Sequence, residues 1–74
     1  SKMTTSEILA VGDKVIVNGS AYWGGNGGKA NLCNNMTMYI TQILGGDYKF
    51  PYGIAKRQGG TRYGWCEKGS LKKA

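Results

Sequence analysis

The sequence predicts an all-β fold, a small barrel of about five to six short strands. Three observations predict it: thirteen glycines against one proline, short β-branched or alternating runs, and turn-forming residues between those runs. Glycine supplies the positive-φ turns that short strands need, at an entropic cost that only turn-rich folds recover. A chain of 74 residues holds one small core, and a barrel buries one face of every strand while closing its own edges.

The first predicted strands lie in the N-terminal third of the chain. Residues 1–7 are expected to form a linker or N-terminal extension, and residues 8–74 the folded domain. Residues 15–17 are Val-Ile-Val between turn residues, which is typical of a strand. Asn18 and Gly19 favour a two-residue hairpin turn, so residues 21–23 are expected to form the returning strand.

A long glycine-rich surface loop is predicted next, over residues 24–35. Four of the six residues 24–29 are glycine, which is too flexible for a regular element. A phosphate-binding loop is excluded, because Ala30 and Asn31 stand where that motif needs its ending and following helix. The loop is therefore either a binding loop or a plain flexible connection.

Three further elements are predicted in the C-terminal half. Residues 36–44 alternate, with Met36, Met38 and Ile40 on one side, which indicates a half-buried strand. Residues 52–56 and 63–66 are two short strands linked by a tight glycine-containing hairpin. Residues 70–72 favour a single helical turn or a last edge strand. The strand count alone does not separate an SH3-like barrel from an OB fold.

The charge balance indicates the class of partner. Ten Lys and Arg against four Asp and Glu give a net charge of +6, which favours polyanions such as nucleic acid or an anionic bacterial wall. No apolar run approaches the roughly 20 residues of a membrane span, and the N-terminus lacks a secretory pattern. A membrane partner is therefore not expected.

Residues suited to catalysis or metal binding are scarce. The chain has no His, and its four carboxylates stand apart in the sequence: Glu7, Asp13, Asp47 and Glu67. General acid or base catalysis needs a positioned and tuned proton acceptor, so we expect no catalytic residue. Cys33 and Cys66 lack the partners of a nucleophilic thiol or a zinc site, so no metal or cofactor is expected. Free thiols are favoured, Cys33 in the loop and Cys66 half-buried in its strand, and a disulfide is the alternative.

Aromatic and cationic side chains are the candidate binding groups. The eight aromatic rings are too many for one small core, so some must lie at the surface. Tyr39 and Ile54 are assigned to the core, while Trp65 is suited to the core or to a groove. In a concave polar site, rings stack on the ligand while Lys and Arg pair with carboxylates and phosphates. The candidate ligand-binding residues are Tyr22, Trp23, Tyr52, Lys56, Arg57, Arg62, Tyr63 and Trp65. The alternative for the cations is a solvated turn.

Motifs along nearly the whole chain resemble a known family. Gly12-Asp13-x-Val15, Tyr22, Pro51-Tyr52-x-Ile54 and Gly64-Trp65 occur in this order. This order resembles the bacterial SH3-type cell-wall-binding domains of phage endolysins and related amidases, over roughly residues 9–72. Cys66 stands where many relatives have Val, which makes the surroundings of that strand harder to predict.

The resemblance implies an SH3-like β-barrel with no catalytic role of its own. Such a domain binds a bacterial cell-wall polymer, peptidoglycan or teichoic acid, and anchors a separate N-terminal amidase, muramidase or peptidase domain to the Gram-positive wall. The resemblance further implies synthesis in the cytoplasm of the infected host and action at the wall after release. Some relatives start their binding domain internally, as Met3 would allow, and this leaves a homo-oligomer open.

Two other binding functions are compatible with this composition. A nucleic-acid-binding SH3-like or OB-like module uses the same rings to stack bases and the same cations to contact phosphates. It is disfavoured because the basic residues are spread along the chain and do not form a stripe. An SH3 domain that binds proline-rich peptides ranks lowest, since its acidic specificity loop is missing from a chain with four carboxylates.

Overall fold

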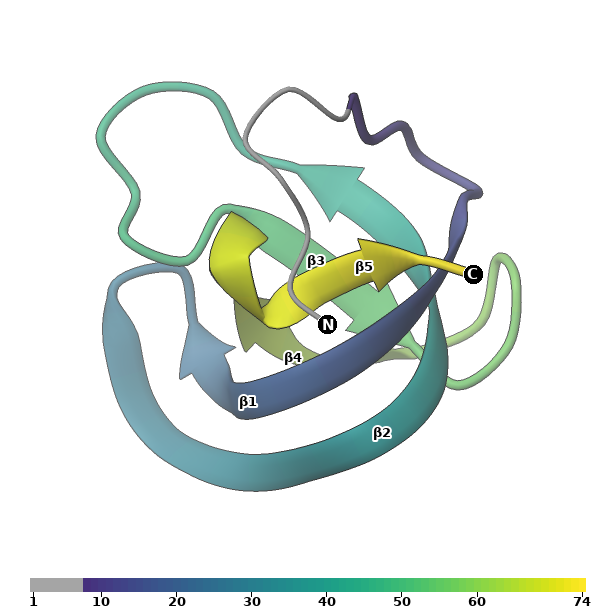
Figure 1. Cartoon of the computed structure of the whole chain (residues 1–74). Helices are drawn as coiled ribbons and strands as arrows, with labels where there is room; N and C mark the ends of the chain where they lie inside the picture. The colour runs from purple at the N-terminus through teal and green to yellow at the C-terminus, as the bar shows by residue number, and fades with distance from the viewer. Residues whose placement is uncertain (1–7) are drawn as a thin grey trace.

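A computed structural model describes residues 8–74 as one sheet of five antiparallel strands (Figure 1). The elements in chain order are β1 (Lys14–Gly24), β2 (Gly27–Ile43), β3 (Tyr52–Ala55), β4 (Arg62–Cys66), the 3₁₀ turn η1 (Lys68–Ser70) and β5 (Leu71–Lys73). The all-β prediction is confirmed. The linker predicted over residues 1–7 lies outside the described residues.

The strand pairings close on themselves. The strand order is β2-β3-β4-β1-β5, and β2 also pairs with β1. The long strand β2 makes this possible, because Tyr39 pairs with Lys14 of β1 and with Ala55 of β3. β5 then adds to β1 at residues 15–17. Figure 1 shows the result as a barrel-like ring in which β2 curves around the outside of β1.

The core lies inside this ring and comes from alternate positions of the strands. Met38 and Ile40 of β2 are buried while Thr37 is exposed, so the predicted alternation is confirmed. Ile54 is fully buried, as predicted, whereas Tyr39 is only half-buried. The core cluster comprises Leu9, Val15, Val17, Ala21, Cys33, Met38, Ile40, Ile54, Cys66 and Leu71. Every member is apolar or a thiol, as expected for a small core without buried charges.

The hairpin turn predicted at Asn18 and Gly19 is wrong. β1 runs through both residues, so residues 21–23 continue β1 and do not form the predicted returning strand. The register between β1 and β2 shifts between Val17 and Gly19, which marks a bulge. The Asn18 side-chain oxygen accepts a hydrogen bond from the Asn35 backbone N–H at 2.8 Å, and the Asn18 amide donates to the Asn35 side chain at 2.9 Å. These bonds hold Asn35 at a φ of 51°. The positive-φ residues therefore bend a continuous hairpin and do not end it.

The long glycine-rich loop predicted over residues 24–35 is also wrong. The turn consists of Gly25 and Asn26 alone, and β2 begins at Gly27. Residues 30–33 pair one by one with residues 19–22 of β1. Backbone hydrogen bonds to β1 thus hold residues 27–35 as a strand, although their composition favours a loop.

The remaining predicted elements are confirmed. The strands predicted at 52–56 and 63–66 are β3 and β4, and Gly60 N–H donates to the Arg57 carbonyl at 3.0 Å in the turn between them. Residues 68–73 form both a 3₁₀ turn and an edge strand. Cys33 and Cys66 are free thiols, as predicted, but both are buried, and Cys33 lies in β2 and not in a loop.

Candidate binding site

A bulge in β4 positions the central residues of the site. Ile54 pairs with Gly64 and Ala55 with Arg62, which leaves Tyr63 as the extra residue. In a regular strand, side chains three positions apart point to opposite faces. Here the Arg62 guanidinium lies over the Trp65 ring, 4.6 Å from its centroid. The bulge thus brings a cation and a ring onto the same side of the sheet.

The first pocket, here called the lysine–arginine pocket, lies where β3 and β4 meet their connecting turn. It is open to solvent and has a volume of about 450 Å³. Its lining residues are Lys56, Arg57, Gly60, Thr61, Arg62 and Tyr63. The Lys56 ammonium lies 5.3 Å from the centroid of the Tyr63 ring, within cation–π range.

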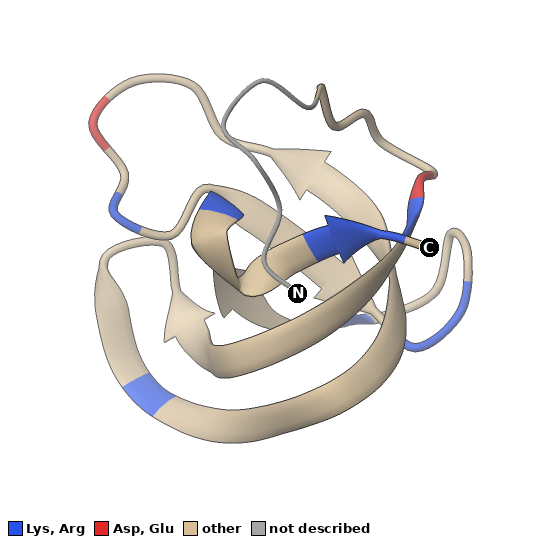
Figure 2. Cartoon of the chain, viewed as in Figure 1, with Lys and Arg blue, Asp and Glu red and all other residues tan. Residues whose placement is uncertain are grey.

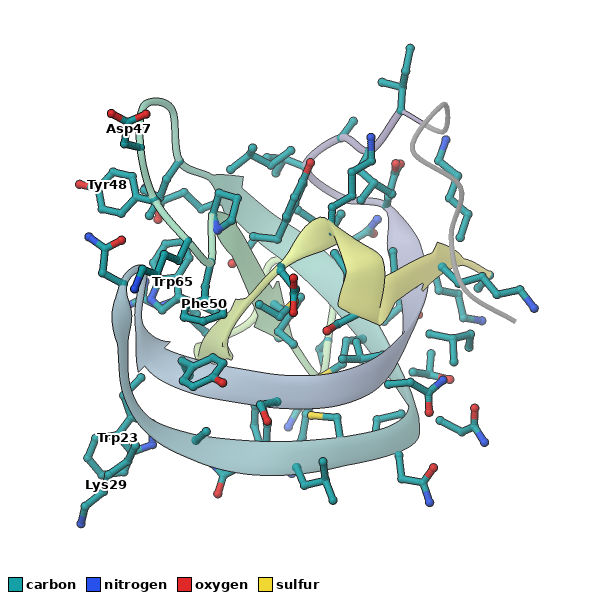
Figure 3. The ribbon with its side chains drawn as sticks, turned by 60° about the vertical axis from the view of Figure 1, so that its left-hand side comes forward. Trp23, Lys29, Asp47, Tyr48, Phe50 and Trp65 are labelled. Carbon is teal, nitrogen blue, oxygen red and sulfur yellow. The ribbon has the colours of Figure 1, made fainter. Side chains whose placement is uncertain are left out.

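The second pocket, here called the tryptophan pocket, adjoins the first. It has a volume of about 290 Å³ and is lined by Trp23, Arg62, Tyr63 and Gly64. Trp23 is 64% exposed near the tip of the β1–β2 hairpin, with the Lys29 ammonium 5.4 Å from its ring centroid. Figure 3 shows these two side chains together, apart from the segment that carries Tyr48 and Phe50. Arg62 and Tyr63 line both pockets and therefore make them one continuous surface.

The charge at this surface has one sign. No carboxylate of residues 8–74 lines either pocket. Asp13 lies elsewhere, where it accepts from the Ala10 N–H at 2.9 Å and pairs with Lys73 at 3.7 Å. Elsewhere Lys and Arg occupy several separate segments around the fold (Figure 2). Without a neighbouring acid to neutralise them, the pocket cations attract anionic groups.

Trp65 supports the site from below. It is only 6% exposed and lies beneath Arg62. A side chain at Gly53 would meet Trp65 at 3.1 Å and the Thr41 hydroxyl at 3.0 Å, so the glycine leaves room for the indole. The Thr41 hydroxyl is buried there without a hydrogen-bond partner among residues 8–74. Of the core and groove interpretations, the structure thus places Trp65 in the packing layer under the pockets.

The eight predicted site residues divide into three groups. Five of them line the pockets: Trp23, Lys56, Arg57, Arg62 and Tyr63. Trp65 lies under Arg62. The other two, Tyr22 and Tyr52, line neither pocket. Tyr22 stacks on Phe50 with centroids 3.9 Å apart, and Tyr52, like Tyr63, packs against the core.

The sequence singles out neither Lys29, which lies beside the site, nor Phe50, which lines neither pocket but helps to hold the hairpin tip. The composition of residues 24–35 predicts a flexible loop around Lys29, whereas the turn at Gly25 and Asn26 places Lys29 beside Trp23. Phe50 is held by its backbone N–H, which donates to the Gly25 carbonyl at 2.8 Å. No local sequence signal indicates that long-range bond. The position of Lys29, in contrast, follows from the sequence once the turn is placed at Gly25 and Asn26.

Comparisons with known proteins add no relative. No family model, no curated protein and no solved structure matches this chain. The family resemblance of the motifs therefore stays a prediction.

Residues 8–74 contain no group of three or more His, Cys, Asp and Glu residues placed to hold a metal ion. The same part of the chain contains no helix that is long and apolar enough to cross a membrane. The pockets offer rings, cations and the hydroxyls of Thr61 and Tyr63, which are groups that bind and orient a ligand.

Proposed function

We propose that this chain is a non-catalytic module that binds a bacterial cell-wall polymer, peptidoglycan or teichoic acid. In the proposal it anchors a separate N-terminal lytic domain, of the endolysin type, to the Gram-positive wall. The order of motifs along the sequence suggested this function. The adjoining pockets support it, because their chemistry suits a polymer that carries both sugar or polyol units and anionic groups.

One observation carries the proposal. Arg62 and Tyr63 belong to both pockets, so rings and cations line one continuous surface. An extended polymer can place a flat, weakly polar unit on Trp23 or Tyr63 and an anionic group near Lys56 or Arg57. A single small ligand needs only one of the two pockets. Two adjoining pockets are better suited to a repeating chain.

The alternative is a nucleic-acid-binding module, for which rings and cations also serve. Figure 2 shows Lys and Arg in several separate segments of the chain, and three of them line the lysine–arginine pocket. Nucleic-acid-binding surfaces gather their cations along the path of the backbone. We therefore rank this function second, and the experiment below separates the two.

Binding of the fluorescently labelled chain to purified Gram-positive walls tests the proposal. The labelled chain is incubated with whole walls, walls stripped of teichoic acid, and single-stranded DNA and RNA of matched charge. We expect binding to at least one wall preparation, and tenfold or greater weakening in Tyr63→Ala. A matched control is Tyr52→Ala, because Tyr52, like Tyr63, is half-buried against the core but lines neither pocket.

Three results would count against wall binding. The first is no retention on any wall preparation. The second is equal loss in the Tyr63 and Tyr52 variants, which would place the ligand elsewhere. The third is tighter binding to the oligonucleotides with a steep salt dependence, which would favour the nucleic-acid function.

A further inference from the structure

The N-terminal half of β2 has one edge without a partner strand. Between Gly27 and Met38, β2 pairs only with β1 within residues 8–74, because its pairing with β3 begins at Tyr39. Figure 1 shows this part of β2 as the outermost run of the sheet. Such an edge presents a row of backbone N–H and C=O groups that another extended chain can bind.

The middle of this edge lacks the features that protect edge strands. Charged side chains, prolines and kinks usually block an edge. In β2 such features lie near the ends of the free segment: the charge of Lys29 lies near the hairpin tip, and the kink lies at Asn35, which has a φ of 51°. The residues between them, 30–34, are Ala-Asn-Leu-Cys-Asn, without charge or proline. Leu32, at their centre, is 79% exposed.

We infer that the β2 edge pairs with the β2 edge of a second copy of this chain. The two strands run antiparallel about a two-fold axis at Leu32. In this register Leu32 lies opposite its own copy, and Ala30 lies opposite Asn34. Lys29 lies opposite Asn35, so no two like charges face each other across the pair.

The charge of the edge is what selects a second copy. An acidic peptide would be drawn to the chain as a whole, which has a net charge of +6, but the free segment offers it only Lys29. A neutral strand with an apolar centre fits better, and the edge itself is such a strand. A pair of such short edges buries much less surface than the roughly 1,600 Å² of a standard complex, so we expect a weak dimer. Salt strengthens it, because salt screens the repulsion between two cationic copies.

Engineered disulfides test the register directly. In mild oxidant we expect the full chain with Leu32→Cys to form covalent dimers, because the two thiols meet at the axis. Ala30→Cys alone should not cross-link, whereas a mixture of Ala30→Cys and Asn34→Cys should. The unmodified chain is the blank, since Cys33 and Cys66 are buried. Equal cross-linking of the Leu32 and Ala30 variants, or none in either, overturns the inference.

Sedimentation equilibrium tests the unmodified edge. We expect a monomer–dimer equilibrium that shifts toward dimer at higher salt, and at least about tenfold weaker association in Leu32→Lys. Val11→Lys is the matched control, because Val11 is 61% exposed and lies outside β2. A chain that stays monomeric, two variants that behave alike, or a monomer that associates only with an added acidic peptide would each overturn it.

Discussion

At the scale of single residues, Gly53 fixes the layer under the pockets. A Cβ there would lie 3.0 Å from the Thr41 hydroxyl, 3.1 Å from the Trp65 ring and 3.2 Å from the Arg62 side chain. We predict that Gly53→Ala lowers the free energy of unfolding by about 1–3 kcal/mol, because three neighbours must move. Urea denaturation followed by tryptophan fluorescence measures this change.

The matched control for this substitution is Gly45→Ala. A Cβ at Gly45 would have no neighbour within 4 Å, and Gly45 does not adopt a positive φ. The control should therefore unfold near the wild-type urea concentration. Equal destabilisation in the two variants would show that the space above Gly53 is not the cause.

The buried thiol of Cys66 makes stability depend on pH. Burial raises the pKa of the Cys66 thiol from 9.0 to about 12, with smaller contributions from the charges of Cys33 and Glu67. Below about pH 9 the thiol is protonated in both states and adds no pH dependence. Between pH 9 and 12 only the unfolded chain releases the proton, so the free energy of unfolding falls by up to about 1.4 kcal/mol per pH unit.

Urea denaturation between pH 8 and pH 10.5 measures this dependence. Cys66→Ala should be less stable at pH 8, because it leaves a cavity. Its stability should then fall less steeply with pH than that of the wild type. Parallel pH profiles in the two chains would refute the assignment to Cys66.

At the scale of elements, the bulge in β1 packs against η1. Gly19 has a φ of 139°, and a Cβ there would lie 2.5 Å from the Ser70 hydroxyl. Gly27 has a similar φ of 132°, with nothing within 4 Å. We predict that Gly19→Ala is destabilising by at least about 1 kcal/mol more than Gly27→Ala, because only Gly19 adds a clash to the backbone strain. Thermal denaturation of both variants measures the difference.

A second substitution isolates the contact. Ser70→Gly removes both Ser70 atoms that a Cβ at Gly19 would approach, at 2.5 and 3.2 Å. In that background the difference between the two glycine variants should shrink. If it stays unchanged, the contact with η1 does not explain the cost at Gly19.

Two of the predicted elements show where sequence reasoning stops. The sequence predicts a hairpin turn at Asn18 and Gly19 and a long loop over residues 24–35. The structure selects Gly25 and Asn26 instead. Bonds from the loop before β3 hold this tip, since Phe50 N–H donates to Gly25 and Lys49 N–H to Asn26. Such long-range bonds leave no periodic signal, whereas the alternation in residues 36–44 comes from burial and is visible in sequence.

At the scale of the whole molecule, the candidate site was predictable in part. The residues on either side of the β3–β4 turn could be found, because a short hairpin keeps its flanks together. The contribution of Trp23 depends on how the β1–β2 hairpin folds over β4, since Trp23 shares its pocket with Gly64. The position of Trp65 beneath Arg62 depends on the bulge at Tyr63 in β4, which the sequence does not predict.

Net charge and local site make different predictions for binding. In the pocket variant, Gln replaces Lys56, Arg57 and Arg62. In the distal variant, Gln replaces Lys14, Lys49 and Lys72, which are exposed and line neither pocket. Each variant loses three positive charges, so general attraction to a polyanion falls equally in both. We predict that the affinity for walls falls at least about tenfold more in the pocket variant than in the distal variant, because only the pocket variant lacks the cations that line the pockets.

Titration of the labelled chain with purified walls at several salt concentrations measures both effects. The distal variant should show a shallower salt dependence with its binding largely kept at physiological salt, since screened long-range attraction contributes little there. The pocket variant should bind weakly at every salt concentration. Equal losses in the two variants would mean that the wall attracts the chain by its total charge, and that the pockets between Trp23 and Arg57 hold no specific ligand.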